Sequence, residues 1–263
     1  MSDFFYLDIP AFNVRYKRWK RYGYLKPDEK ENMKQALCEA GKGYCMYCYS
    51  RVKVDGKLFA NLEHAIEKQN SAKLVECIPN IGLSCTVCNQ SFKRTGERRR
   101  KVQKRIRDEF EEKSRCGVKR RKQFTVPCNA LRNLQKAYSD MPEAEIILQP
   151  MGMKGKESGN PLNIQYDIIK MEFGPNTNRY TYSEGETAFI HKHIQRFRLN
   201  DPKYRTPLLV DYIKSMIDSG GVLQKYEYNN MIVELFAEKL KGRTAEEKVR
   251  ICSRIYIMMF LKI

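Results

Sequence analysis

The sequence predicts an α+β fold that is predominantly helical, with a small core of two strands and a helix. Three observations support this prediction. Apolar residues recur at helical spacing after residue 125, whereas residues 44–94 are rich in turns and contain two short strand patterns. Two Cys-x-x-Cys pairs, Cys45/Cys48 and Cys85/Cys88, enclose those strand patterns. Each pair can present two thiolates, so together they predict a closed, tetrahedral structural zinc site.

The 263 residues are enough for one to two domains, and we divide them into three segments. Residues 1–43 should form a basic arm and a helix, and residues 44–125 the zinc-stabilised core with a basic helix after it. Residues 126–263 should form a mostly helical region that could dock a partner.

The elements of the first half follow from local signals. Pro27 should begin a helix that ends near Ala40, before Gly41. Asp55-Gly56 predicts a hairpin turn after Val54. Strands are then expected over 58–62 and 81–84, and a short helix from 86 to 95.

Residues 93–122 contain 15 Lys/Arg against five Asp/Glu. Val102, Ile106 and Phe110 recur every four residues, so we predict one helix with a narrow apolar stripe and a basic remainder. Beyond it we expect helices over 130–138, 183–197, 207–218, 223–240 and 245–261, strands over 146–148 and 164–173, and a loop or boundary over 151–159. Capping boxes are predicted for the pairs Ser183/Glu186 and Thr244/Glu247.

Charge and cysteine content limit the classes of function. The formal charge is +18, from 49 Lys+Arg and 31 Asp+Glu, which favours a polyanionic partner. The longest apolar run, Ile255–Leu261, is too short for a membrane span, which needs about 20 residues. No basic leader precedes an apolar stretch, and the cysteine count of nine is odd. We therefore expect a cytoplasmic protein with no membrane contact and no disulfide framework, whose other five cysteines are buried by packing.

The basic arm over residues 11–26 has six Lys/Arg, no acidic residue and the only tryptophan, Trp19. The arm could lie along phosphates and stack on bases. The alternative is a solvated terminus with Trp19 packed in the core.

A group of polar residues between and beside the cysteine pairs can carry chemistry. His64 is the only nearby side chain whose ordinary pKa suits a general base near neutrality. Glu63 and Asn89 offer the hard oxygen ligands that Mg²⁺ accepts. Asn80 precedes the second strand, and Lys93 lies one helical turn beyond Asn89.

The string NLEHAIEK…PNIGLSCTVCNQSFK resembles the motif of HNH endonucleases with a four-cysteine zinc site, the ββα-metal type. The resemblance implies that His64 is the general base and that Asn80 pins the loop that orients it. It also implies that Glu63 and Asn89 hold a catalytic Mg²⁺ or Mn²⁺. Lys93 stands where some members have a further histidine, and we expect it to contact phosphate.

A weaker likeness links the basic helix and the stretch IHKHIQRFRLNDPKYR to the HNH subunits of Septu-type and retron-associated antiphage systems. Glu67-Lys68 replaces the Pro-Lys of their usual motif. This likeness implies a role in bacterial antiphage defence and a partner subunit, such as an ATPase.

We therefore expect a metal-dependent endonuclease that hydrolyses phosphodiester bonds of DNA, with RNA left open. The residues expected to contact phosphates are Lys93, Arg94, Arg98, Arg99, Arg100, Lys104 and Arg105. The alternative is a non-catalytic, zinc-ribbon-like nucleic-acid-binding protein in which Glu63 and His64 are incidental. His191 and His193 do not share a helix face, so we assign them only surface or packing roles.

Overall fold

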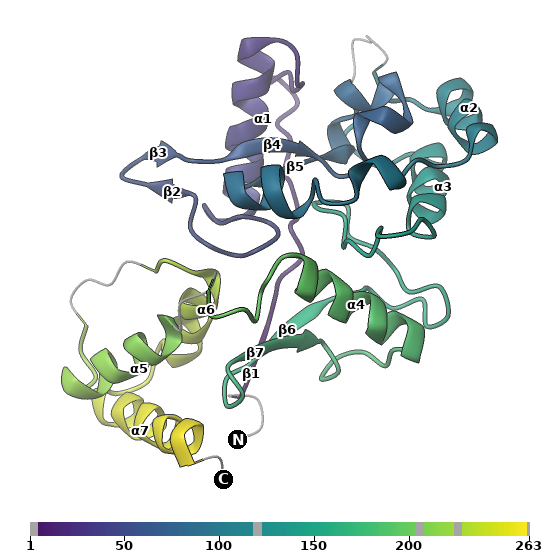
Figure 1. Cartoon of the computed structure of the whole chain (residues 1–263). Helices are drawn as coiled ribbons and strands as arrows, with labels where there is room; N and C mark the ends of the chain where they lie inside the picture. Colours follow the sequence, from purple (N-terminus) through teal and green to yellow (C-terminus); the bar gives the residue numbers. More distant parts are fainter. Residues whose placement is uncertain (1–4, 118–122, 204–207, 224–227, 262–263) are drawn as a thin grey trace. The chain divides into compact units, whose positions relative to one another are not determined.

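The computed structural model describes residues 5–117, 123–203, 208–223 and 228–261, which form helices and small antiparallel sheets (Figure 1). The α+β class predicted from the sequence is confirmed at this level. The chain divides into two units. We call Ala11–Cys48 with Val52–Lys154 the cysteine-cluster unit, and Met1–Pro10, Tyr49–Arg51 and Gly155–Ile263 the C-terminal unit. The boundary after Lys154 falls inside the glycine-rich stretch 151–159.

The cysteine-cluster unit combines three α-helices with two small hairpins and several short helical turns. The helices are α1 (Pro27–Ala40), α2 (Lys104–Lys113) and α3 (Asn129–Tyr138), and the strands are β2 (Lys53–Val54), β3 (Lys57–Leu58), β4 (Asn61–His64) and β5 (Ile81–Ser84). The turns are η2 (Lys68–Asn70), η3 (Ala72–Glu76), η4 (Ile78–Asn80), η5 (Cys88–Phe92) and η6 (Glu97–Arg99). The predicted bounds of α1 and β5 are confirmed.

The β4–β5 hairpin positions the candidate site. The two strands are antiparallel, and Glu63 lies opposite Gly82 while His64 lies opposite Ile81. β4 begins at Asn61 rather than at residue 58, because Leu58 pairs with Lys53 in the β2–β3 hairpin. A Cβ atom at Gly82 would lie 2.8 Å from the carbonyl oxygen of Gln149, so only glycine allows this backbone approach.

The prediction of one long basic helix over 93–122 is wrong. Gly96 has a left-handed φ of +72° and ends the first helical turn. Arg100 is fully buried, so the chain around it follows the core and not a surface helix. α2 begins only at Lys104, and it ends at Lys113. Residues 118–122 lie outside the described residues. Tertiary burial of a charged side chain therefore overrides the periodicity of the apolar stripe.

The strand predicted over 146–148 is also wrong. Ile146, Ile147 and Leu148 are buried, but they pair with no strand among the described residues. The backbone approach of Gln149 to β5 instead places this segment against the β4–β5 hairpin. The short apolar run over 146–148 therefore indicates burial and not pairing in a sheet.

In its described residues, the C-terminal unit contains a three-stranded antiparallel sheet and four helices. The strands are β1 (Tyr6–Asp8), β6 (Ile164–Asp167) and β7 (Glu172–Pro175), in the order β1–β6–β7. The helices are α4 (Glu184–Arg196), α5 (Leu208–Asp218), α6 (Met231–Leu240) and α7 (Ala245–Leu261). α4 packs against β7, and α5 packs against α7 (Figure 1).

Local sequence signals in this unit have mixed outcomes. Both predicted capping boxes are confirmed: Ser183 and Glu186 hydrogen-bond reciprocally at the start of α4, as do Thr244 and Glu247 before α7. The predicted strand over 164–173 is instead the β6–β7 hairpin, and β1 was not predicted. α6 begins at Met231, after an Asn230 cap, rather than at 223. No helix in the described ranges is both long and apolar enough to cross a bilayer.

Candidate functional site

Cys45, Cys48, Cys85 and Cys88 meet in one cluster. Their sulfur atoms all lie within 4.8 Å of one another, and this cluster could hold a zinc ion. The first pair follows α1 and the second follows β5. The backbone N–H of Met46 donates to the carbonyl oxygen of Leu83 (3.1 Å), so the hairpin and the first pair are held together.

A backbone N–H group and burial determine the electrostatic environment of the cluster. The N–H of Cys85 donates to the sulfur of Cys45 at 3.3 Å, as is typical of ligand sulfurs. Burial raises the pKa of the Cys45 thiol well above its ordinary value. A zinc ion would supply the positive charge that stabilises the thiolates.

The second part of the candidate site is a pocket of about 260 Å³ in the same unit, which we call the acid–histidine pocket. Its walls include Glu63, His64, Glu67, Asn89 and Lys93. Glu63 and His64 end β4, and Asn89 and Lys93 follow the second cysteine pair. The structure therefore brings five of the residues singled out in the sequence to one place, since Arg94 also lines this pocket.

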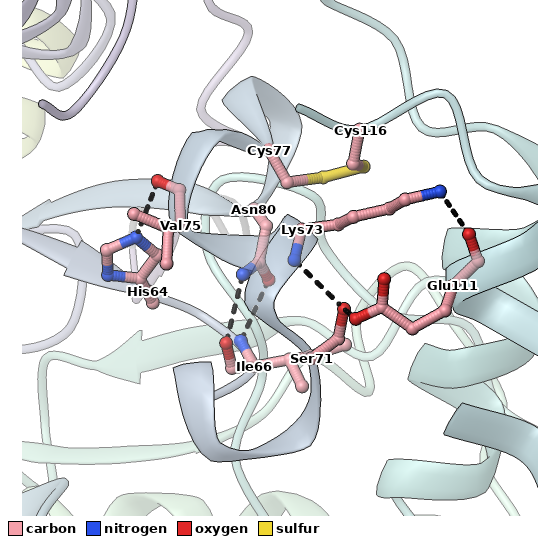
Figure 2. The surroundings of a disulfide bond; sticks show 9 residues. All are labelled: His64, Ile66, Ser71, Lys73, Val75, Cys77, Asn80, Glu111 and Cys116. Atoms are coloured by element: carbon pink, nitrogen blue, oxygen red, sulfur yellow. Dashed lines mark hydrogen bonds between the residues drawn. A yellow bond between two sulfur atoms is a disulfide. The ribbon is translucent and has the colours of Figure 1, made fainter. Parts of the chain in front are cut away.

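His64 is 7% exposed and its ring position is defined by two neighbours. Its Nε2 lies 3.1 Å from the carbonyl oxygen of Val75 (Figure 2). Because a carbonyl only accepts, Nε2 carries the proton and Nδ1 has the free lone pair. Tyr24 contacts the ring edge-on, with centroids 4.6 Å apart. Burial lowers the pKa of His64 to about 4, so the imidazole is neutral at neutral pH.

Asn80 is fully buried and bonds to the backbone two residues after His64 (Figure 2). Its side chain accepts from the N–H of Ile66 (2.8 Å) and donates to the carbonyl of Ile66 (2.9 Å). Its own carbonyl accepts from the N–H of Ala65 (2.8 Å). Asn80 therefore fixes the chain direction where β4 ends.

Glu63 is buried between a phenol and an ammonium group. The Tyr47 hydroxyl donates to its Oε2 at 2.7 Å, and Lys93 forms an ion pair with its Oε1. Burial raises the pKa of the Glu63 carboxyl, and the Lys93 ammonium opposes that rise. Lys93 was expected to contact phosphate, but it is only 4% exposed and its ammonium pairs with Glu63 below the surface.

Glu67 completes the buried network, although the sequence marks it only as a departure from the family motif and predicts no role for it. Arg100 donates to its Oε1 from Nε (3.0 Å) and Nη2 (2.8 Å), and the Tyr138 hydroxyl donates to the same oxygen (2.8 Å). Lys93 Nζ lies 3.6 Å from that oxygen. The spacing of four residues from Glu63 could have suggested a second inward carboxylate, but its partners are distant in the sequence.

The predicted phosphate contacts have different environments. Arg94, Arg98, Arg99, Lys104 and Arg105 are exposed, and Arg94 also lines the acid–histidine pocket. Arg100 is the exception and requires a correction, because its side chain is 0% exposed and pairs with Glu67. Its role is to hold the network rather than to contact a phosphate from the surface.

A disulfide joins Cys77 to Cys116, contrary to the expectation of reduced cysteines (Figure 2). It links the chain between η3 and η4 to the residues just after α2. Cys77 lies two residues after Val75, the partner of His64. The pairing depends on tertiary proximity across 39 residues, which the sequence spacing did not reveal. Cys38 and Cys252 are free and buried, as expected.

Two further expectations concern aromatic and histidine side chains. Trp19 is 80% exposed, so the alternative with Trp19 in the core is wrong. His191 is exposed, and His193 is buried with its ring 4.8 Å from that of Phe197.

Comparison with known proteins finds no family model, no curated protein and no solved structure that matches the chain. The function must therefore be argued from the two adjoining parts of the candidate site. Those parts are the four-cysteine cluster and the acid–histidine pocket.

Proposed function

We propose that this protein is a metal-dependent endonuclease of the HNH type that hydrolyses phosphodiester bonds of DNA. The observation that carries the proposal is the position of His64: its Nε2 is bonded to Val75, which leaves Nδ1 as an acceptor, and it shares a pocket with Glu63 and Asn89. This arrangement suits a base that accepts a proton from water beside a hard-cation site.

The residues present fit a divalent cation. Glu63 and Asn89 place carboxylate and amide oxygens on the wall of one pocket, and Mg²⁺ and Mn²⁺ prefer such oxygen ligands. Glu67 also lines the pocket, and its Oε2 is buried without a hydrogen-bond partner in the described part of the chain. When bound, the ion would stabilise negative charge on the phosphate and on the leaving oxygen.

The chain's own residues have distinct tasks in this proposal. His64 Nδ1 accepts the proton of the attacking water, and the Val75 carbonyl stabilises the imidazolium through Nε2–H. Asn80 keeps the backbone beyond His64 in place. The exposed residues Arg94, Arg98, Arg99, Lys104 and Arg105 bind flanking phosphates and position the duplex without reading its sequence.

Plasmid cleavage with Mg²⁺ or Mn²⁺ tests the proposal by comparing the wild type with His64→Ala. A positioned base contributes about 10²–10⁴-fold, so we expect a loss of that size with zinc and DNA binding retained. His191→Ala is the matched control, because this exposed histidine lies outside the pocket. Equal cleavage by wild type and His64→Ala would contradict the catalytic assignment.

A second candidate is a non-catalytic zinc-ribbon-like nucleic-acid-binding protein. It is favoured by the ion pair of Glu63 with Lys93, which compensates the carboxylate charge within the chain. In that case wild type and His64→Ala bind DNA with the same affinity and neither cuts it. Cleavage that depends on His64 excludes this candidate.

We extend the proposal to bacterial antiphage defence, where residues 126–263, most of which belong to the C-terminal unit, would dock a partner subunit such as an ATPase. The support is the sequence likeness around residues 190–205, of which 204 and 205 lie outside the described residues. Co-purification with the product of a neighbouring gene would test it. A stable monomer that cuts DNA freely would contradict a required partner.

A further inference from the structure

The Lys93 ammonium lies against the Glu63 carboxylate, where a metal ion bound to Glu63 would lie. It pairs with Glu63 Oε1, lies 3.6 Å from Glu67 Oε1, and donates to the carbonyl oxygen of His64 at 2.5 Å. All three partners are oxygens, and the lysine side chain is 6% exposed. An ammonium with three donors is thus held as a small metal ion would be, by carboxylate and carbonyl oxygens.

The buried charges are already balanced without any other ion. Glu63 and Glu67 contribute two negative charges, and Lys93 and Arg100 contribute two positive charges. Adding a divalent cation to this neutral group would place uncompensated positive charge next to a buried ammonium, which is strongly unfavourable.

The Lys93 ammonium and a divalent cation would also bind the same oxygen of Glu63. Glu63 Oε2 accepts from Tyr47, so Oε1 is the oxygen that faces Lys93 and the one through which Glu63 would reach an ion. Arg100 cannot leave as easily, because four of its hydrogen bonds reach Glu67, Thr95 and the Lys93 carbonyl. Lys93 has a flexible four-carbon stem, so it is the cation that can move.

We propose that the Lys93 ammonium is a resident counter-ion of this pocket and that a divalent cation binds Glu63 only after displacing it. The inference rests on the proposed function, in which Glu63 is a metal ligand. It implies that the site binds metal weakly until the displaced ammonium finds another anion, such as a phosphate of the substrate.

Calorimetric titration of the zinc-loaded full chain with MnCl₂ tests this proposal. We expect Lys93→Met to bind Mn²⁺ with a dissociation constant lower by about tenfold or more, because an adjacent positive charge is removed. Lys68→Met is the matched control, since Lys68 lines the same pocket but is exposed beside the Tyr24 ring. The dissociation constant of Lys68→Met for Mn²⁺ should stay within about twofold of the wild-type value. Equal or weaker Mn²⁺ binding by Lys93→Met overturns the proposal.

A labelling measurement on the wild type covers the case in which Lys93→Met does not fold. Acetylation of each lysine is quantified by mass spectrometry with and without saturating Mn²⁺. Lys93 should be protected without Mn²⁺ and react when Mn²⁺ is present, while Lys68 reacts equally in both. Protection of Lys93 that persists at saturating Mn²⁺ overturns the proposal.

Glu63→Gln separates failure of this inference from failure of the proposed function. One outcome is that Glu63→Gln loses Mn²⁺ binding while the wild type and Lys93→Met bind Mn²⁺ equally well. This result overturns the counter-ion role of Lys93 and leaves Glu63 as a metal ligand. Mn²⁺ binding that survives Glu63→Gln overturns both assignments.

Discussion

Asn80 shows how one buried side chain can hold the backbone beside His64, the proposed catalytic base. Its amide satisfies both the N–H and the carbonyl of Ile66, and it has no exposed surface. Both backbone groups would lose their partner if the amide were removed, and a buried unpaired polar group costs more than the net value of a hydrogen bond.

Asn80→Ala should therefore lower the free energy of unfolding by about 2–4 kcal/mol, measured by urea denaturation. We also expect cleavage by the folded variant to fall, because the chain after His64 loses its support. A destabilisation below about 0.5 kcal/mol would contradict this role.

Asn70→Ala is the matched control for that prediction. Asn70 is also buried and bridges two backbone groups, donating to the carbonyl of Arg100 (3.0 Å) and accepting from the N–H of Val102 (2.8 Å). The Asn70→Ala variant should be destabilised to a similar extent, with a smaller loss of cleavage per folded molecule, because the hydrogen bonds of Asn70 reach Glu67, Arg100 and Val102 rather than the two residues directly after His64.

At the scale of elements, the chain between β4 and β5 contains only the short helical turns η2, η3 and η4 among its described elements. The disulfide between Cys77 and Cys116 links these turns to the residues just after α2. Ser71 and Lys73 also bond to Glu111 of α2, so the same two elements are joined a second time (Figure 2).

Cys116→Ser should lower the free energy of unfolding by up to about 4 kcal/mol, because the disulfide closes a loop of 39 residues in the unfolded chain. Urea denaturation with zinc present, with and without a reductant, measures the effect. Reductant should lower the free energy of unfolding of the wild type toward that of the variant. It should leave the free energy of unfolding of Cys116→Ser unchanged. Cys128→Ser, which removes a free cysteine, is the control. A wild type that is indifferent to reductant would contradict a stabilising disulfide.

At the scale of the whole molecule, the two units differ in the contacts that hold them together. The C-terminal unit has a three-stranded sheet with helices packed on it and on one another. The β4–β5 hairpin of the cysteine-cluster unit has only four residues per strand, and the four-cysteine cluster joins it to the chain before β2.

Removal of zinc with a chelator should therefore unfold the hairpin and with it the acid–histidine pocket. Structural zinc can contribute an apparent ~10–16 kcal/mol to folding, so the loss is large compared with the stability of such a short hairpin. Hydrogen exchange should show loss of protection in β4 and β5 and retained protection in β6 and β7. Unchanged protection of β4 and β5 after metal analysis has shown zinc removal would contradict a structural zinc.

Local signals carried much of what could be predicted. The helix beginning at Pro27, the Asp55-Gly56 turn and the two capping boxes depend on neighbouring residues only, and all are present in the structure. The long basic helix and the strand over 146–148 failed because burial of Arg100 and of Ile146–Leu148 depends on distant partners.

The sequence by itself determined the four-cysteine cluster, because each Cys-x-x-Cys pair is a local knuckle that needs a second pair to complete a metal site. It also predicted a strand just before Glu63-His64, although β4 covers Asn61–His64 rather than 58–62. Only the tertiary structure decided how the charges are paired. Arg100 lies 33 residues from Glu67, and Cys116 lies 39 residues from Cys77. A buried charge needs a partner wherever the fold can supply one, and the fold supplied Lys93 to Glu63 and Arg100 to Glu67.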